Sequence, residues 1–168
     1  MPKDRKLPSV DRLREAMLYD PQTGSIVRGS DSKRGRWKAG SPMGTLSKGY
    51  LYINLDRVIY GAHRMIWKYM TGEDPSGDID HINGNPSDNR WCNLRVATRG
   101  QNTLNRTALK NNKLGAKGVH QIKTSGRFRA RVGIGYKSID LGVFGTLEEA
   151  KAAYDAAAKV LHGDFFKS

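Results

Sequence analysis

A short segment, residues 109–117, constrains how this chain can fold. It has few apolar side chains and is rich in lysine, asparagine and glycine: Lys110, Asn111, Asn112, Lys113, Gly115 and Lys117. A stretch of this composition is typical of a linker, because it offers little apolar surface to bury. The chain has 168 residues, enough for one domain or for two small ones. The linker favours separate folded regions on its two sides.

The charge of the chain is positive and unevenly distributed. The net charge is +13 at pH 7. Residues 1–60 carry 12 basic and 6 acidic side chains, residues 61–110 carry 7 and 5, and residues 111–168 carry 10 and 5. Basic flanks around a nearly balanced middle suit a chain that holds a nucleic acid beside carboxylates kept for a metal. Simple solubility is the alternative, because net charge alone assigns no function.

The single cysteine, Cys92, excludes an intrachain disulfide and a zinc site built from several cysteines. It lies between Trp91 and Asn93, and we expect it to be buried. No run approaches the roughly 18 apolar residues of a membrane span, and the basic start of the chain leads into no apolar signal segment. We therefore expect a cytoplasmic protein without a membrane partner.

The first 60 residues are expected to form a β-rich region that begins with a helix. Ser9 can cap a helix over residues 10–18, and residues 19–24 have the proline and glycine of a turn. A polar, basic and glycine-rich loop or ribbon follows over residues 29–49.

That loop contains Arg34, Arg36 and Trp37 and is expected to lie near phosphate. Trp37 is most simply a packing residue, with stacking on a base or sugar as the alternative.

Strand and helix patterns follow this loop. Residues 50–55 alternate as a strand does, and residues 58–60 continue after a turn. Residues 62–71 are expected to form a helix that Gly72 closes.

A carboxylate and an imidazole are adjacent at Asp80 and His81. Such a pair can hold one divalent metal beside one general base, which is the outline of a site that cleaves phosphodiesters. We expect both residues in a hairpin-like loop. The alternative is a turn in which the aspartate accepts backbone hydrogen bonds and the histidine is solvated.

A helix after this loop is predicted by the capping box of Thr98 and Gln101. It should cover residues 99–110 and carry Asn102 in its first turns. Arg99, Asn102 and Arg106 recur at helical spacing, so they share one face.

The last segment alternates cationic and apolar residues and then becomes helical. Arg127, Arg129 and Arg131 should lie on one strand face, with apolar residues on the other. A second strand should present Ile139, Leu141 and Val143 on one face. Thr146 and Glu149 form a capping box that opens a helix, whose packed face is expected to comprise Leu147, Ala150, Tyr154, Ala157 and Leu161.

Several motifs in the middle of the chain belong together: Asp80-His81-Ile82-Asn83-Gly84-Asn85, Asp88-Asn89-Arg90, Asn93-Leu94-Arg95 and Gln101-Asn102. This run resembles the HNH endonuclease family, in particular its phage and intron-associated members related to homing endonucleases. The turn at residues 19–24, the strand at residues 49–50 and the segment 62–67 are also similar to such nucleases. The resemblance covers about residues 7–106.

A second resemblance rests on Gly118-Val119, Arg127-Phe128-Arg129, Leu141-Gly142-Val143-Phe144 and the run from Glu148 to Ala158. Residues 118–163 are similar to the DNA-binding domain of apetala/ethylene-response-factor proteins. Members of that family lay a three-stranded sheet in the major groove and read bases with arginine and tryptophan. Here the corresponding face has no tryptophan, and Asp140 stands where an aromatic residue is common.

The resemblances imply an α+β fold in four parts. Residues 1–60 would be an N-terminal β-rich DNA-contacting region, and residues 61–108 a ββα-metal nuclease core. The basic linker of residues 109–117 would then lead to a DNA-binding domain over residues 118–168, a three-stranded antiparallel sheet packed on one helix.

The site implied by the first resemblance has four residues. His81 would be the general base, and Asn93 would orient it. Asp80 and Asn102 would hold one Mg²⁺ or Mn²⁺. Many HNH proteins have histidine in place of Asn102, so the amide favours a hard cation over zinc. Asn102 could instead serve only the start of its helix, and His63 could be structural or contact DNA.

The expected partner is double-stranded DNA. Candidate contacts are Arg34, Arg36, Arg99, Arg106, Lys117, Arg127, Arg129, Arg131 and Lys137, and Arg95 is a further phosphate candidate.

The expected function is a site-specific endonuclease of homing type, encoded by a phage or mobile element in a bacterial host. A monomer with one active site would nick one strand, and cleavage of both strands would need a dimer, re-engagement or a second protein. The main alternative is a non-catalytic, sequence-specific DNA-binding regulator with a degenerate core. A nonspecific nuclease is a third reading.

Overall fold

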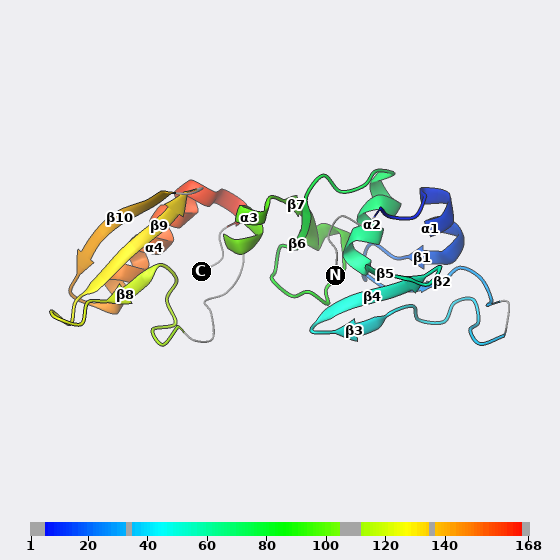
Figure 1. Ribbon diagram of the computed structural model, residues 1–168, viewed down its shortest axis with the longest axis horizontal. Coiled ribbons are helices and arrows are strands. Elements are labelled where there is room, and N and C mark those ends of the chain that lie inside the picture. Colours follow the sequence, from blue (N-terminus) through cyan, green and yellow to red (C-terminus); the bar gives the residue numbers. More distant parts are fainter. Residues whose placement is uncertain (1–5, 33–34, 105–111, 135–136, 166–168) are drawn as a thin grey trace. The chain divides into compact units, whose positions relative to one another are not determined.

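The computed structural model describes residues 6–32, 35–104, 112–134 and 137–165 (Figure 1). The chain divides into two units, Met1–Ala97 and Thr98–Ser168, each with its own hydrophobic core. The first combines short antiparallel strands with two helices, and the second packs a three-stranded antiparallel sheet on one helix. The predicted α+β fold is confirmed. The predicted boundaries at residues 60, 108 and 117 stay predictions.

A short helix and a hairpin open the first unit. Helix α1 (Val10–Ala16) begins at Ser9, whose side chain accepts a hydrogen bond from the N–H of Arg12. The helix ends before the predicted residue 18, because Met17 is extended and starts strand β1 (Met17–Tyr19), which pairs with β2 (Ile26–Arg28). Met17 and Tyr19 are buried while Leu18 is exposed, so strand pairing overrides the helical pattern.

Two predicted strands and the predicted second helix follow, joined by a third strand that lies within the segment 29–49 expected to be a loop or ribbon. The sheet contains β3 (Thr45–Ser47), β4 (Tyr50–Leu55) and β5 (Val58–Gly61), in that order. Helix α2 (Ala62–Thr71) ends at Gly72, whose φ of +86° is the left-handed conformation that glycine adopts without a steric cost.

The core of the first unit joins these elements. Its fully buried side chains include Leu13, Met17, Ile53, Met65 and Ile66. They come from α1, β1, β4 and α2. The interlocked core therefore fixes α2 against the sheet and gives the following hairpin a rigid support.

That hairpin consists of β6 (Asp78–His81) and β7 (Leu94–Ala97), with the short 3₁₀ helix η1 (Trp91–Asn93) leading into β7. Asp80 and His81 lie on a strand, so the expected position in a loop is wrong. Cys92 is exposed, against the prediction of a buried thiol. The residues on either side of Cys92 are the ones that pack inward. Asn93 is buried, and the ring centroid of Trp91 lies 5.1 Å from that of Trp67.

The second unit starts with helix α3 (Arg99–Leu104) and continues with the sheet and its covering helix. The strands are β8 (Val119–Gln121), β9 (Phe128–Ile134) and β10 (Lys137–Phe144). Helix α4 (Leu147–His162) begins with the predicted capping box of Thr146 and Glu149 and lies along one face of the sheet (Figure 1). The short 3₁₀ helix η2 (Gly163–Phe165) follows.

Two details of the second unit differ from the sequence patterns. A β-bulge between Asp140 and Gly142 interrupts the expected alternation of Ile139, Leu141 and Val143. Leu161 is 41% exposed, whereas Ala158 is fully buried and takes its place in the core. The packed face of α4 therefore ends on alanine and not on leucine.

Candidate functional site

The β6–β7 hairpin places a buried carboxylate opposite an arginine. Asp80 is directly across from Arg95 in the strand register. Nε of Arg95 donates a hydrogen bond to Oδ2 of Asp80 at 3.0 Å, and Nη2 lies 2.9 Å from the same oxygen. The Asp80 side chain is 5% exposed. The guanidinium therefore compensates the charge of a carboxylate that would otherwise be costly to bury.

His81 follows on the same strand, at the point where the hairpin opens into its loop. It is buried, and its Nε2 atom lies 3.4 Å from Oδ1 of Asn89. Burial lowers the pKa of His81 below the ordinary histidine value. The imidazole is therefore uncharged at neutral pH, which is the state that can accept a proton.

Two aromatic rings from other elements pack around His81. Its ring centroid lies 5.4 Å from that of His63 on α2 and 6.0 Å from that of Tyr50 on β4. His63 is half-buried, and desolvation lowers its pKa to about 3. His63 is thus a neutral packing ring beside His81, while the partly exposed Tyr50 borders solvent.

The loop between the two strands is closed by Asn93. Its Oδ1 accepts from the N–H of Asn83 at 2.9 Å, and its Nδ2 donates to Oδ1 of Asn83 and to the carbonyl of Asp88. Its own carbonyl accepts from the N–H of Ile82, the residue after His81. Asn93 therefore ties both ends of the loop at the position of His81.

Charged and aromatic residues fasten this loop further. Arg90 binds the carboxylate of Asp88 through Nε at 2.8 Å and Nη2 at 2.6 Å, which holds the pKa of Asp88 well below its usual range. The hydroxyl of Tyr19 donates to the carbonyl of Asn89 at 2.8 Å, and the N–H of Trp91 donates to the carbonyl of Pro21 at 3.0 Å. The β1–β2 hairpin thus supports the residue that contacts His81.

Asn102 lies on α3, in the second unit. The predicted capping box is present there, since Gln101 accepts from the N–H of Thr98 at 2.8 Å and Thr98 accepts from that of Gln101 at 3.3 Å. The N–H of Asn102 donates to the carbonyl of Thr98. Its position beside Asp80 stays a prediction.

The donor chemistry of these residues suits a hard divalent cation. In the described part of the chain, no three His, Cys, Asp or Glu side chains are grouped as a metal site. A site built on Asp80 would therefore depend on amide, water and phosphate oxygens, which are ligands that Mg²⁺ commonly accepts. With a single cysteine in the sequence, the set does not offer the sulfur donors of a multi-cysteine zinc site.

The open face of the second sheet gathers cations. Ala130 and Val132 are buried against α4, whereas Arg129 and Arg131 alternate with them on the other face. Both Nε atoms lie 3.6 Å from Oδ2 of Asp140, across the sheet on β10. The predicted cationic strand face is therefore present, with one carboxylate between two guanidinium groups.

The remaining predicted DNA contacts are distributed over both units. Arg36 is exposed on the β2–β3 loop, Lys137 is exposed at the start of β10, and Nη2 of Arg127 donates to the carbonyl of Val143 at 3.2 Å. Lys117 is half-buried before β8. Arg34, Arg106 and the side chain of Arg99 lie outside the described residues.

Some contacts at the site had little signal in the sequence. The contact between Arg95 and Asp80 was not predicted. It depends on the hairpin register that pairs His81 with Leu94, because that register puts Arg95 opposite Asp80. His63 and Tyr50 reach His81 from distant elements, so no local pattern could have identified their contacts.

Comparison with known proteins gives two family matches. Residues 60–104 match the model of an HNH endonuclease family, and residues 114–164 match the AP2 domain. These matches indicate nuclease activity and DNA binding. HNH nucleases generally use a divalent metal.

Two phage-related proteins are similar to the chain. Protein 3.8 of Escherichia phage T7 is 33% identical over 104 residues, which are 61% of this chain and 85% of the relative. The SPbeta prophage-derived protein YosQ of Bacillus subtilis (strain 168), named as an HNH homing endonuclease, is 31% identical over 93 residues. That match covers 55% of this chain and 53% of YosQ. No solved structure matches the chain. In the described residues, no helix has the length and apolar character needed to cross a membrane.

Proposed function

This chain belongs to the HNH endonuclease family and carries an AP2 domain toward its C-terminal end, and we propose that it is a site-specific DNA endonuclease of homing type. It hydrolyses one phosphodiester bond and nicks one strand per binding event. It uses one divalent metal, Mg²⁺ or Mn²⁺, and His81 as the general base. The phage and prophage sources of its relatives support an origin in a phage or mobile element, with action inside a bacterial host.

The observation that carries this proposal is that a buried carboxylate and a buried imidazole of lowered pKa occupy adjacent positions of β6. His81 and Asp80 are both held by neighbours, Asn89 on one side and Arg95 on the other. A base fixed in its neutral state needs no reorganisation before it accepts a proton.

The contact with Asn89 guides the roles of the two nitrogens of His81 in this proposal. The amide oxygen Oδ1 of Asn89 can only accept, so a hydrogen bond between the two side chains requires the hydrogen on Nε2 and makes Nδ1 the nitrogen that acts as the base. Nδ1 takes a proton from the attacking water as the water oxygen bonds to phosphorus. The bond to the 3′ oxygen breaks, and that oxygen is protonated by solvent. The products are 5′-phosphate and 3′-hydroxyl ends.

Asp80 and Asn102 are the residues that would hold the cation, and Asn93 positions His81 through the loop that it closes. When bound, the cation supplies the positive charge that stabilises the phosphorane and the departing 3′ oxygen. Arg95 compensates the charge of the Asp80 carboxylate and orients it.

DNA recognition is spread over both units. The candidate contacts are Arg127, Arg129, Arg131 and Lys137 toward the C-terminal end of the chain, and Arg34, Arg36, Arg99, Arg106 and Lys117 at earlier positions. Two modest binding surfaces on one chain combine through effective concentration, which gives a long footprint to a small protein.

A DNA-binding regulator with an inactive core is the second candidate. The buried ion pair of Asp80 with Arg95 favours it, because a carboxylate already neutralised by arginine attracts a cation less strongly than an unpaired one. The two candidate functions can be told apart by one product, because an endonuclease leaves a nicked strand and a regulator does not.

A plasmid nicking assay separates them. The wild-type protein should relax supercoiled plasmid with Mg²⁺ or Mn²⁺ and not with EDTA. His81→Ala should abolish nicking while it binds the same DNA within about twofold in a gel-shift assay, since the imidazole acts in the chemical step. His162→Ala, at the end of α4, removes an imidazole elsewhere and should nick like the wild type. Nicking by His81→Ala would refute the general base, and binding without nicking by the wild type would favour the regulator.

A further inference from the structure

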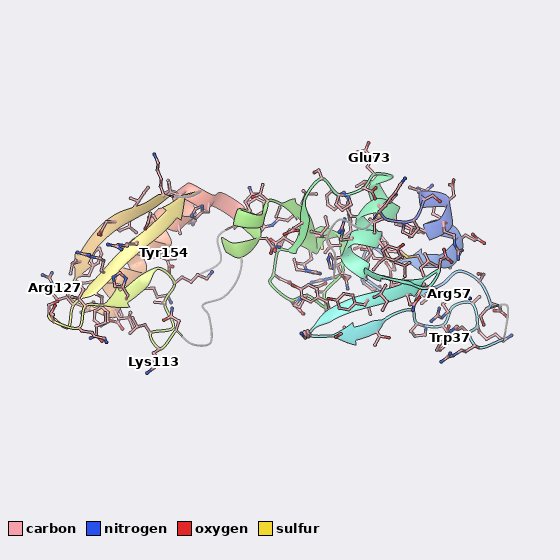
Figure 2. All side chains as sticks on the ribbon, in the orientation of Figure 1. Trp37, Arg57, Glu73, Lys113, Arg127 and Tyr154 are labelled. Atoms are coloured by element: carbon pink, nitrogen blue, oxygen red, sulfur yellow. The ribbon has the colours of Figure 1, made fainter. Side chains whose placement is uncertain are left out.

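The loop between β2 and β3 carries an exposed tryptophan flanked by two arginines. Cζ of Arg28 lies 4.5 Å from the centroid of the Trp37 ring, and Cζ of Arg36 lies 5.1 Å from it. The Trp37 side chain is labelled on this loop in Figure 2 and is 44% exposed. We propose that Arg28, Trp37 and Arg36 form a clamp for the phosphate backbone of duplex DNA. In this clamp the indole ring orients the two guanidinium groups before DNA binds. This proposal rests on the proposed DNA-binding function and adds a contact site to it.

The loop is fixed where Trp37 emerges. The N–H of Trp37 donates to Oγ of Ser32 at 2.9 Å, and the carbonyl of Trp37 accepts from the N–H of Ser32 at 3.0 Å. Asp31 accepts from the N–H of Ala39 at 2.8 Å and from Nζ of Lys38 at 2.9 Å. An exposed side chain on a backbone tied on both sides loses little conformational entropy when it binds.

Arg28 is held in register with the returning end of the same loop. Its N–H donates to the carbonyl of Ser41, and its carbonyl accepts from the N–H of Gly40, both at 2.9 Å. Its Nε atom is buried and has no hydrogen-bond partner among the described residues. The indole ring, and not a carboxylate, therefore sets the orientation of this guanidinium.

Both guanidinium groups keep their full positive charge for a partner. In the described part of the chain, no carboxylate forms an ion pair with Arg28 or Arg36. A cation over an aromatic face is stabilised without being neutralised, so it can still bind an anion. A guanidinium group can donate two hydrogen bonds to one phosphate, and two such groups without a carboxylate partner can bind two phosphates of a nucleic acid backbone.

The other tryptophans show what a packing role looks like. Trp67 and Trp91 are half-buried, contact each other at 5.1 Å and pack against the core of the first unit. Trp37 is not part of that core. Its contacts with two arginines also leave less of the ring open to a stacked base, which is why a backbone clamp fits the geometry better than base stacking.

The test measures DNA affinity as a function of salt in the full chain carrying His81→Ala, so that DNA is bound but not cut. Fluorescence anisotropy with a labelled duplex gives the dissociation constant at several KCl concentrations. Four changes are compared: Trp37→Ala, Trp37→Phe, the double change Arg28→Ala with Arg36→Ala, and Arg14→Ala on the exposed side of α1 as the control. Circular dichroism confirms that each variant is folded.

The clamp predicts a specific order of effects. The double arginine variant should lose about 1.8 from the slope of log K against log salt, because each phosphate contact contributes about 0.9. Trp37→Ala should weaken binding on the order of fivefold, and Trp37→Phe should restore most of the loss because it keeps an aromatic face. Arg14→Ala should change the affinity less than twofold.

Two outcomes would overturn the clamp. Equal affinity and slope in Trp37→Ala, the double arginine variant and Arg14→Ala would remove Trp37 and both arginines from the interface. A loss in both Trp37 variants with no loss in the double arginine variant would replace the clamp by base stacking. A parent protein that fails to bind DNA would instead refute the proposed function itself.

Discussion

Asp80 and Arg95 face each other across the β6–β7 hairpin, with Nη2 of the arginine 2.9 Å from Oδ2 of the aspartate. Their side chains are 5% and 14% exposed. The pair compensates the charge of a buried carboxylate. Arg95 thus has a role in orienting the proposed metal ligand, in addition to the phosphate contact that the sequence suggested.

Replacing Arg95 with Met should destabilise the first unit by about 3 kcal/mol, because the buried carboxylate loses its partner. Urea unfolding followed by tryptophan fluorescence is suited to this measurement, since Trp37, Trp67 and Trp91 all lie in the first unit. Adding Asp80→Asn to the Arg95→Met variant should recover most of the loss. A loss that is the same with and without Asp80→Asn would mean that Arg95 acts through packing.

Acid should destabilise the first unit through His63. Its pKa is about 3 in the folded chain against an ordinary value of 6.5, so the unfolded chain binds more protons between these limits. The stability contributed by the neutral ring is complete above pH 6.5 and is lost as the pH falls toward about 3. The expected loss is about 1.4 kcal/mol per pH unit for one proton.

His63→Phe keeps a ring at this position and removes its proton. Urea unfolding of this variant at pH 7, 6 and 5 should show a slope smaller than that of the wild type by about one proton. The slope that remains includes His81, whose pKa is also lowered by burial. His120→Phe, in the second unit, is the control and should leave the fluorescence-detected slope unchanged. Identical slopes for wild type and His63→Phe would show that His63 does not titrate on unfolding.

Gly118→Ala should destabilise the second unit strongly. Gly118 has a φ of +64°, and a Cβ atom there would collide with the Tyr154 ring and the carbonyl of Arg131. Figure 2 labels Tyr154 on the helix that covers the sheet. We expect a loss of about 3 kcal/mol from backbone strain and overpacking together.

Gly115→Ala separates the two causes. Gly115 has the same φ of +64° and open space around it, so alanine there should cost only about 1 kcal/mol of backbone strain. Hydrogen exchange of the β9 and α4 amides measures both variants. Equal losses in the two variants would show that the contact with Tyr154 and Arg131 is relieved by local movement.

Asp140→Asn should make DNA binding tighter and less selective. The Oδ2 atom of Asp140 lies 3.6 Å from Nε of both Arg129 and Arg131, and its Oδ1 accepts from the N–H of Gly142 at 2.9 Å. Without the charge, both guanidinium groups are freer to bind any phosphate. Nonspecific affinity should rise about twofold to fivefold at low salt.

Selection of bound duplexes from a random pool measures the second effect. Asp140→Asn should enrich target sequences less than the wild type does. Asp155→Asn on α4 removes the same charge from outside the sheet and should leave the enrichment unchanged. An unchanged enrichment in Asp140→Asn would separate this carboxylate from sequence recognition.

The sequence predicted those parts of the fold that depend on neighbouring residues. Ser9 and Thr146 cap their helices, Gly72 ends α2, and residues 50–55 form the strand that their alternation predicts. Each of these features follows from hydrogen bonds and side-chain periodicity within a few positions.

Features that depend on distant pairing were predicted less well. The helix predicted through residue 18 yields to a strand at Met17 because β2 supplies a partner. The bulge at Asp140 and Gly142 likewise depends on how β10 fits β9. At the site, the motif identified Asp80 and His81, but the ring of His63 reaches His81 only through the packing of α2 on the sheet.

The hydrogen bonds from Tyr19 to Asn89 and from Trp91 to Pro21 mean that the nuclease segment depends on the hairpin that precedes it in the chain. The stretch that matches the nuclease family begins at residue 60, yet the loop that contacts His81 is fastened by a hairpin some seventy positions earlier in the chain. A transplanted fragment that starts at residue 60 would leave Asn89 without this support. Exchange of such nucleases between mobile elements should therefore preserve the whole segment from the first hairpin onward, and recombination is better tolerated after β7 than before β6.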